Sequence, residues 1–264
     1  MKTRIITGVV AGALFIPFVI YGKLPFTLLV YALAAVGIYE ILRMKKLPIF
    51  SVPGILGLLA TFTLMMPKGW EEQVQGWTTY SKLELLYIAA LLLLIYTVVV
   101  KNHFTFDDAA FVILSTLYVG MGFYYLIVTQ GAGVEYIIFA LLIVWTTDSG
   151  AYFTGRSFGK RKLWPDISPN KTVEGFVGGI VIAVVAAVIM QFIAPFSISW
   201  VGIIIIAVVS SVFGQLGDLV ESAIKRHYDV KDSGTILPGH GGILDRFDSL
   251  LFVLPLLNLL HFVN

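Results

Sequence analysis

Acidic side chains and glycines gather in one polar segment, residues 215–249, of an otherwise apolar chain. Within it, Asp245 and Asp248 are three residues apart, so both carboxylates share one face if a helix has begun there. Two carboxylates this close repel each other unless a cation lies between them. An oxygen-only ligand set of this kind favours Mg²⁺ or Mn²⁺, and Mg²⁺ is usually shared with substrate phosphates.

A second polar group ends the apolar stretch that precedes this segment. Asp218, Ser222 and Lys225 are spaced i, i+4 and i+7, so they share one face of a helix predicted over 199–225. Asp218 lies roughly two turns inside the end of that helix, where apolar surroundings favour a metal or a cationic partner. Pairing with Lys225 is the structural alternative, although its reach at i+7 is poor.

A third polar group ends the helix predicted over 134–155 and continues into the loop 156–174. Asp148 lies roughly two turns inside this helix, where a carboxylate needs a partner or a cation. A hydrogen bond to a neighbouring helix is the alternative explanation. In the loop, Ser168 and Lys171 precede another apolar helix, so they could hold a phosphate at its N-terminus. The alternative is a capping box, in which Asn170 or Lys171-Thr172 starts the helix and Glu174 closes it.

The stretch Leu237-Pro-Gly-His-Gly-Gly242 is too rich in glycine for a helix. Gly241 and Gly242 let the backbone approach a ligand and expose successive N–H groups, which suits phosphate, with His240 as a donor or proton shuttle. Glycines also simply make turns, and a lone histidine in a loop is often incidental.

Composition places these groups in a membrane protein. The chain of 264 residues is 58% hydrophobic and 13% charged, whereas soluble domains are about 25% charged. With no cysteine, disulfides, Cys-ligated metals and thiol nucleophiles are excluded. We expect an all-α polytopic protein, forming one integral-membrane domain over 1–264, with N-terminal helices in 1–100 and catalytic helices and loops in 101–264. About nine spans are predicted at roughly 4–22, 25–43, 51–67, 83–100, 108–129, 134–155, 175–195, 199–225 and 248–263.

The basic residues predict the orientation of these spans. With nine spans, fifteen of the eighteen lysines and arginines share one side with the N-terminus, and the other side holds Lys23, Lys68 and Lys82. This bias predicts that the N-terminus and the loops 156–174 and 226–247 face the cytoplasm. The active-site loops would then be cytoplasmic. The loop 68–82, which contains Trp70 and Trp77, would face outward as an interfacial aromatic belt.

The sequence predicts acidic metal ligands, basic groups and a glycine-rich loop at one membrane face. This combination favours phosphoryl or nucleotidyl transfer, in which catalysis depends mainly on charge neutralisation and positioning. The sequence contains no Walker, kinase or Rossmann signature. A transporter with Asp148 and Asp218 as coupling-ion sites is the non-enzyme alternative. It is disfavoured because the charges gather toward the predicted cytoplasmic side rather than at midplane.

Three runs carry a resemblance to a known family: Ser222-Ala-Ile-Lys225-Arg226, then Lys231-Asp-Ser-Gly234, then Leu237-Pro-Gly-His-Gly-Gly-Ile-Leu-Asp-Arg-Phe-Asp248. Together they resemble the signature of phosphatidate cytidylyltransferases, also called CDP-diacylglycerol synthases. Asp148 and the run Ser168–Gly175 are also similar to that family. The resemblance implies that CTP and phosphatidate react, with Mg²⁺, to give CDP-diacylglycerol and pyrophosphate. It further implies a homodimer in the cell's inner membrane that feeds phospholipid synthesis and has no nucleic-acid partner.

On this basis we assign expected roles. Asp218, Asp245 and Asp248 are the expected metal ligands, and Asp148 is a further ligand or the anchor of a second cation. Lys225, Arg226 and Arg246 are expected to neutralise the triphosphate or the lipid phosphate. The nucleotide phosphates are expected to lie against His240, Gly241 and Gly242. Ser168, Lys171 and Ser222 are expected to approach the same phosphates. Another lipid-phosphate cytidylyltransferase, or a lipid-alcohol kinase, could use similar parts.

Overall fold

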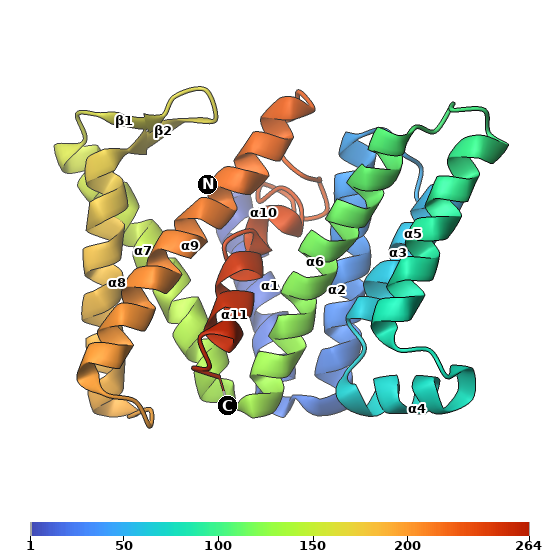
Figure 1. Ribbon diagram of the computed structural model, residues 1–264. Helices are drawn as coiled ribbons and strands as arrows, with labels where there is room; N and C mark the ends of the chain where they lie inside the picture. Colours follow the sequence, from blue (N-terminus) through green and yellow to red (C-terminus); the bar gives the residue numbers. More distant parts are fainter. Residues whose placement is uncertain (1, 264) are drawn as a thin grey trace. The chain divides into compact units, whose positions relative to one another are not determined.

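The protein is built almost entirely of α-helices, as the computed structural model of residues 2–263 shows (Figure 1). In this part of the chain the helices are accompanied by one antiparallel sheet of two short strands. In chain order the elements are α1 (Lys2–Tyr21), α2 (Lys23–Met44), α3 (Val52–Leu64), α4 (Lys68–Thr78), α5 (Lys82–Val99), α6 (Phe106–Ala132), α7 (Val134–Phe158), β1 (Lys162–Trp164), β2 (Ser168–Thr172), α8 (Val173–Ile193), α9 (Trp200–His227), α10 (Leu244–Phe247) and α11 (Leu250–Leu259).

Six of the described helices are long and apolar enough to cross a membrane, namely α2, α5, α6, α7, α8 and α9. Helices α3 and α4 form a pair bent by 116°, which makes a seventh candidate if the pair is one broken span. Each of the nine predicted segments contains a helix, but the predicted count of nine spans is not confirmed. The apolar stretch of α1, Ile6–Tyr21, and helix α11 are shorter than the ~20 residues that a span requires.

The chain divides into two compact units, and each of them draws on two stretches of sequence. The first unit consists of Met1–Val128 and Ser233–Leu244, and the second consists of Thr129–Asp232 and Asp245–Asn264. The polar segment 215–249 therefore contributes to both units. The predicted single domain over 1–264 stays a prediction.

In the first unit α3 packs against both α2 and α5, and the buried apolar residues of these helices include Ile38, Leu42 and Leu93. Helix α5 begins with a capping box in which Ser81 and Glu84 satisfy each other's backbone N–H groups. Figure 1 shows α4 running across the ends of α3 and α5. The loop predicted over 68–82 is therefore largely the helix α4, although its Trp77 is exposed, in keeping with the expected aromatic belt.

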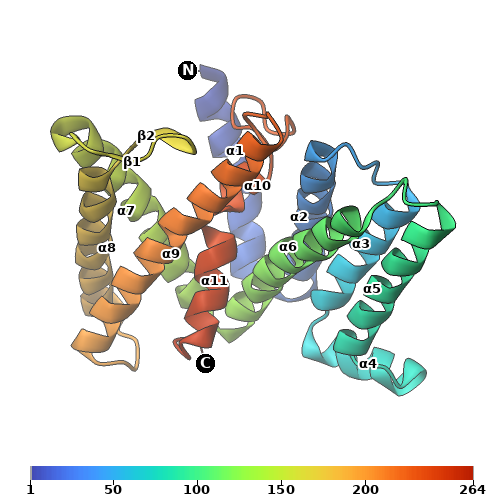
Figure 2. The same cartoon turned by 45° about the horizontal axis from the view of Figure 1, so that its top comes forward.

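In the second unit, α7 and α8 lie side by side because small residues line their interface. A Cβ added at Gly150 would lie 2.9 Å from Cβ of Ile182, and one added at Gly178 would collide with Thr154. Glycines at such places let helix backbones approach closely in membranes. Figure 2 shows the hairpin β1–β2 at the end of this helix pair. Helix α9 packs against α8 and α11, so its polar end lies among these elements.

The hairpin is a feature that the sequence analysis missed, since it treated 156–174 as an irregular loop. Strand β1 pairs with β2 in an antiparallel register, Lys162 opposite Thr172 and Trp164 opposite Ser168. Thr172 then caps α8, because its side chain accepts a hydrogen bond from the amide of Gly175 at 3.1 Å. Glu174 accepts from the amides of Lys160 and Arg161. Thr172 is thus confirmed as the start of a capped helix, while Glu174 ties the hairpin to α8 rather than closing a capping box.

Candidate active site

Most of the residues predicted to do chemistry lie in the second unit, on four elements that the fold brings together. Helix α7 carries Asp148, and strand β2 carries Ser168 and Lys171. Helix α9 carries Asp218, Ser222, Lys225 and Arg226, and α10 carries Asp245 and Arg246, with Asp248 directly after it. Helix α9 has 28 residues, which at ~1.5 Å each exceeds a hydrocarbon core of ~30 Å, so its polar end can extend beyond that core.

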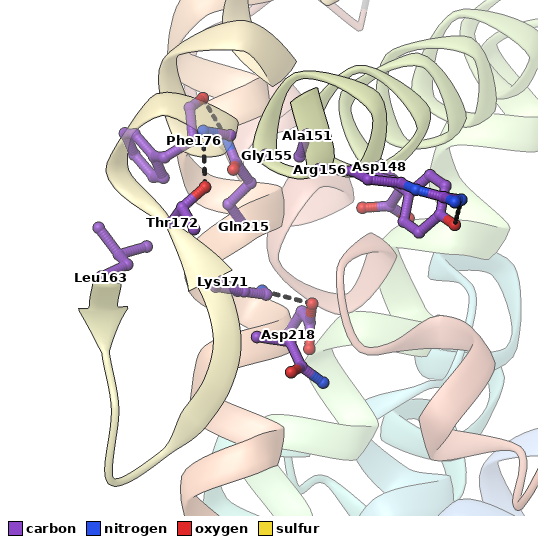
Figure 3. A pocket seen from close by; sticks show the side chains of 13 residues that line it. Asp148, Ala151, Gly155, Arg156, Leu163, Lys171, Thr172, Phe176, Gln215 and Asp218 are labelled. Carbon is purple, nitrogen blue, oxygen red and sulfur yellow. Dashed lines mark hydrogen bonds and ion pairs between the residues drawn. The ribbon is translucent and has the colours of Figure 1, made fainter. Parts of the chain in front are cut away.

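A pocket of about 470 Å³ lies between α7, the hairpin, α8 and α9 (Figure 3). Its volume is within the range of small-molecule sites. Both polar and apolar residues line this pocket, namely Asp148, Ala151, Tyr152, Gly155, Arg156, Leu163, Asn170, Lys171, Thr172, Gly175, Phe176, Gln215 and Asp218. Asp148, Lys171 and Asp218 were predicted as site residues, whereas Tyr152, Phe176 and Gln215 were not. A large anionic substrate would therefore meet charged, amide and aromatic groups in one cavity.

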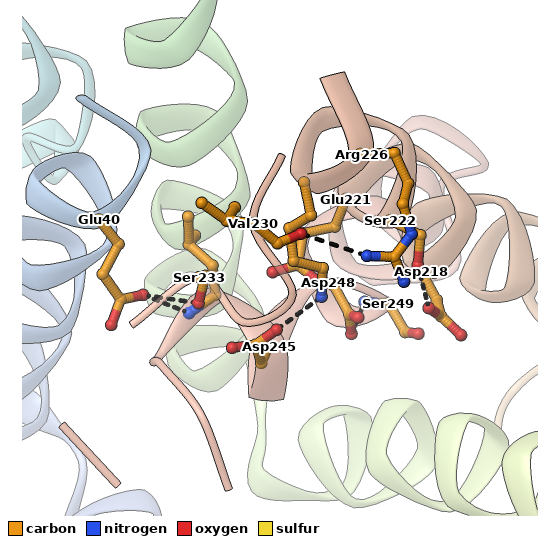
Figure 4. A network of polar contacts seen from close by, with 12 residues as sticks. Glu40, Asp218, Glu221, Ser222, Arg226, Val230, Ser233, Asp245, Asp248 and Ser249 are labelled. Atoms are coloured by element: carbon orange, nitrogen blue, oxygen red, sulfur yellow. Dashed lines mark hydrogen bonds and ion pairs between the residues drawn. The ribbon is translucent and has the colours of Figure 1, made fainter. Parts of the chain in front are cut away.

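Asp218 and Lys171 form an ion pair across this pocket, and Ser222 donates a hydrogen bond to Asp218 Oδ1 at 3.3 Å (Figures 3 and 4). Lys171 therefore reaches α9 from the hairpin, while its predicted approach to the nucleotide phosphates stays a prediction. The alternative pairing of Asp218 with Lys225 is wrong. Both partners are partly exposed, with side-chain exposures of 25% and 32%, so a substrate phosphate could compete for the lysine.

Asp148 presents an exposed carboxylate to the same pocket from a helix long enough to span a membrane. Within the described chain it forms no hydrogen bond or ion pair, so the alternative explanation, a hydrogen bond to a neighbouring helix, is not borne out. An ionised group in a span-length helix is costly unless it faces water, a partner or a cation. Its position beside Asp218 and Lys171 supports a functional interpretation.

Lys225 bridges two carboxylates instead of pointing into open solvent. Its Nζ lies 2.7 Å from Glu221 Oε2 and 2.6 Å from Asp245 Oδ1, and all three side chains are largely buried. The other oxygen of Glu221, Oε1, is buried without a hydrogen-bond partner in the described structure. Glu221 had no predicted role, although its i, i+4 spacing to Lys225 was a usable signal. The bridge fixes Asp245, which comes from a different element, against α9.

Asp248 follows α10 and is held by a 2.6 Å hydrogen bond from the amide of Ser249. Desolvation by burial, and secondarily the negative charge of Asp218, raise the pKa of Asp248 to about 7. A carboxylate in this position is protonated near neutral pH unless a cation offsets the neighbouring negative charge. Part of this shift comes from the carboxylate of Asp218, so the two acidic groups interact electrostatically.

The predicted metal ligands do not form a closed cage. Among the described residues, no three His, Asp or Glu side chains are grouped so as to hold a metal ion by themselves. Asp218 and Asp245 are each paired with a lysine. The oxygen donors nevertheless fit Mg²⁺, which proteins commonly bind through one or two carboxylates while waters and substrate phosphates complete the shell. Asp148, Asp218, Asp245 and Asp248 stay predicted ligands.

The remaining basic groups are less constrained. Arg226 is exposed and donates to the carbonyl of Val230 at 3.2 Å (Figure 4), while Arg246 is exposed at the start of α10. Ser168 stands opposite Trp164 in the hairpin and does not line the pocket. The roles assigned to Arg226, Arg246 and Ser168 in phosphate binding stay predictions.

His240, Gly241 and Gly242 belong to the first unit. The amide of His240 donates to the carbonyl of Leu237 at 2.8 Å, and Gly239 and Gly241 have left-handed φ angles of 78° and 81°. These glycines therefore make the turn, as the structural alternative proposed. The Nδ1 atom of His240 is buried without a hydrogen-bond partner in the described chain. Phosphate binding by this loop stays a prediction.

Comparisons with known proteins place the whole chain in one family. The sequence model of the cytidylyltransferase family matches residues 2–263. A phosphatidate cytidylyltransferase of Bacillus subtilis (strain 168) is 57% identical, over 97% of this chain and 96% of that protein. Enzymes of the same name from Staphylococcus haemolyticus and from Staphylococcus aureus (strain COL) are 47% and 45% identical, each over 98% of both chains.

Proposed function

Since this chain belongs to the cytidylyltransferase family, we propose how its residues carry out the reaction that its relatives' names describe. The enzyme transfers CMP from CTP to phosphatidate, giving CDP-diacylglycerol and pyrophosphate for phospholipid synthesis. The observation that carries the assignment of the site is the pocket of the second unit, where Asp148, Asp218 and Lys171 meet at the ends of span-length helices. One substrate is soluble and the other is anchored in lipid, so a site at such helix ends suits both.

In the proposed mechanism a phosphate oxygen of phosphatidate attacks the α-phosphorus of CTP. The bond from that phosphorus to the bridging oxygen of the β-phosphate breaks, and pyrophosphate leaves with the bonding electron pair. The lipid phosphate is already an anion, so no protein nucleophile is required. The protein's task is to bring two polyanions together and to offset their charge.

Lys171 is proposed to bind a substrate phosphate, because it is partly exposed in the pocket and its ion pair with Asp218 can be exchanged for another anion. Arg156 lines the same pocket, where its Nη1 donates to the hydroxyl of Tyr152 at 3.0 Å. Both side chains can approach phosphate oxygens without crossing the apolar core.

Lys225 receives a different role from the one that the sequence suggested. It is buried and already bonded to Glu221 and Asp245, so it holds the acidic side chains in place rather than meeting the triphosphate. We propose that Asp218, Asp245 and Asp248, with Asp148, hold Mg²⁺, with up to two cations per site. A bound Mg²⁺ would offset the charge of the phosphates and orient them for in-line displacement.

Topology and assembly complete the proposal. Residues 2–263 contain six helices that could span a membrane, or seven if the bent pair α3–α4 is one span, which is compatible with an integral membrane protein. The distribution of lysine and arginine supports placing the N-terminus and the active site on the cytoplasmic side of the inner membrane. A homodimer is proposed on the family resemblance alone, and mass measurement of the purified enzyme in detergent tests it.

The function is tested with CTP labelled on either the α- or the γ-phosphate, phosphatidate and purified protein. A cytidylyltransferase places the α label in lipid and releases the γ label as pyrophosphate. A lipid-alcohol kinase would place the γ label in lipid. Replacing phosphatidate with a polyprenyl phosphate or an archaeal lipid separates this enzyme from other lipid-phosphate cytidylyltransferases, because only the preferred lipid will take up the α label efficiently.

A further inference from the structure

Glu40 is a buried carboxylate on α2, within the first unit, and it has no role in the mechanism above. Its side chain is 2% exposed. It accepts hydrogen bonds from the hydroxyl of Ser233 at 3.1 Å and from the amides of Ile243 and Leu244, both at 2.9 Å (Figure 4 shows the bond to Ser233). These donors come from the segment 233–244, about 200 residues later in the chain. One carboxylate thus joins both ends of a loop that carries His240.

Two glycines of this loop, Gly234 and Gly242, lie so close to Glu40 that a side chain there would meet its carboxylate. A Cβ added at Gly242 would collide with Glu40 and with the hydroxyl of Ser233. One added at Gly234 would collide with Oε1 of Glu40 and lie 2.9 Å from its Cδ. Real Cβ atoms do not approach other atoms this closely, so a larger residue at either position would force the carboxylate of Glu40 to shift away from its hydrogen-bond donors. Gly242 therefore has a structural reason to be glycine, independent of any phosphate.

The chemistry of Glu40 suits a clamp. An ionised carboxylate accepts hydrogen bonds through two oxygens and donates none, so it can satisfy several converging N–H and O–H groups. Hydrogen bonds to an ionised acceptor are shorter and stronger than neutral ones. Glutamine in the same place would offer one carbonyl oxygen, and its NH₂ group would face an amide that also donates.

We propose that Glu40 is a positioning residue: through Ser233, Ile243 and Leu244 it fixes the loop that presents His240 and leads directly into Asp245. Leu244 is the first residue of α10, and Asp245 is the next residue in the chain, so a fixed Leu244 amide limits where α10 can start. Loops that carry functional groups depend on rigid elements to place them. This inference rests on the proposed roles of Asp245 and His240, and it gives the N-terminal half of the chain a part in catalysis.

The first test measures turnover in Glu40→Gln and Glu40→Asp, with the exposed Glu72→Gln on α4 as a matched control. We expect kcat of Glu40→Gln to fall on the order of 100-fold, since small misplacements of catalytic groups have effects of that size. KM for phosphatidate should change little, because the pocket residues of the second unit are untouched. Glu40→Asp should recover part of kcat because it restores a two-oxygen acceptor, and Glu72→Gln should match the wild type.

The second test follows the loop itself and does not depend on activity. The chain has no cysteine, so a single cysteine can report local exposure to a maleimide. Ile243→Cys replaces a residue that is 7% exposed. Adding Glu40→Gln should raise its labelling rate more than about tenfold, the factor expected for loss of one hydrogen bond to a charged group. Ile236→Cys, already exposed, should label equally in both backgrounds, and Ala183→Cys in α8 should stay protected.

The proposal is overturned if Glu40→Gln leaves both kcat and the labelling of Ile243→Cys unchanged. It is also overturned if kcat falls while Ile243→Cys stays protected, because the loop would then not be the route. If Glu40→Gln does not fold, Ser233→Ala removes one of the three bonds and must show smaller changes in the same direction, and no change there overturns the proposal. Failure of the wild type to place the α label in lipid would contradict the proposed function instead, and the labelling result would be unaffected by it.

Discussion

Replacing Lys225 with methionine removes the ammonium group that joins Glu221 to Asp245, and it keeps an unbranched side chain of similar length. Side-chain exposures of 11% for Lys225, 1% for Glu221 and 5% for Asp245 mean that water cannot readily take its place. Breaking a buried ion pair by removing one partner costs about 3–5 kcal/mol, because the remaining charge is left uncompensated. Two carboxylates are left here, so we expect a value in the upper part of that range.

For a chain of this size, 1 kcal/mol corresponds to a change in Tm of about 2–4 °C. Lys225→Met should therefore lower the Tm of the purified enzyme by roughly 6–20 °C in a thermal-unfolding assay in detergent. The exposed Lys162→Met on β1 is the matched control and should leave the Tm within about 2 °C of the wild type, since surface substitutions rarely exceed ~0.5 kcal/mol.

A double-mutant cycle with Glu221→Gln tests the cause. Neutralising Glu221 removes part of the uncompensated charge, so the double variant should be more stable than the sum of the single effects predicts, by about 1–3 kcal/mol. The reasoning is refuted if Lys225→Met leaves the Tm unchanged and the cycle is additive. A large loss of kcat with no loss of stability would instead return Lys225 to phosphate binding.

Three further perturbations address the pocket, the carboxylates and the helix interface. Without Mg²⁺, Asp248 binds more protons in the folded state than in the unfolded chain between about pH 4 and 7, so the Tm of the wild type should fall as pH rises through this window. Asp248→Asn should flatten that fall and abolish Mg²⁺-dependent turnover. An unchanged pH profile or a near-normal rate in this variant would contradict the assignment. Lys171→Met should raise KM for an anionic substrate at least about tenfold by removing a charge-assisted contact, measured by initial rates against Lys162→Met, and equal KM values would exclude a phosphate-binding role for Lys171. Gly150→Ala should cost about 1–3 kcal/mol by overpacking α7 against α8, whereas Gly131→Ala, with nothing within 4 Å of its added Cβ, should be neutral in the same unfolding assay.

Much of the site could be anticipated from local spacing. The i, i+4 relation of Asp218 and Ser222 is a property of one helix, and their hydrogen bond follows from it. Asp245 lies in the short helix α10, whereas Asp248 directly follows its end, so the shared helix face that their spacing suggested stays a prediction. The pairing of Lys171 with Asp218 was not predicted, because the spacing of the residues in the chain does not show which basic side chain packing brings to Asp218.

Other features could not be deduced from the linear order of residues. Glu40 stands in an apolar stretch, and an isolated carboxylate there is a reason to suspect function, but nothing in the sequence identifies its donors 193 residues away. The hairpin β1–β2 was missed because its strands are short and mostly exposed, without an alternating apolar pattern. The predicted count of nine spans is not confirmed, because among the described residues the apolar stretch of α1 and helix α11 are shorter than a bilayer core requires and α3 qualifies only together with α4.

By itself, the sequence determined the helical class, the membrane character and the family, because hydropathy and signature spacing are local properties of the chain. It also determined which acidic and basic side chains, and which glycine-rich backbone, are available for nucleotidyl transfer. Only the tertiary structure decided how those groups pair: Lys171 with Asp218, Lys225 with Glu221 and Asp245, and Glu40 with the loop 233–244. The reason is physical, since a buried charge is stabilised by whichever partner packing brings within hydrogen-bond distance, and packing joins residues far apart in the chain.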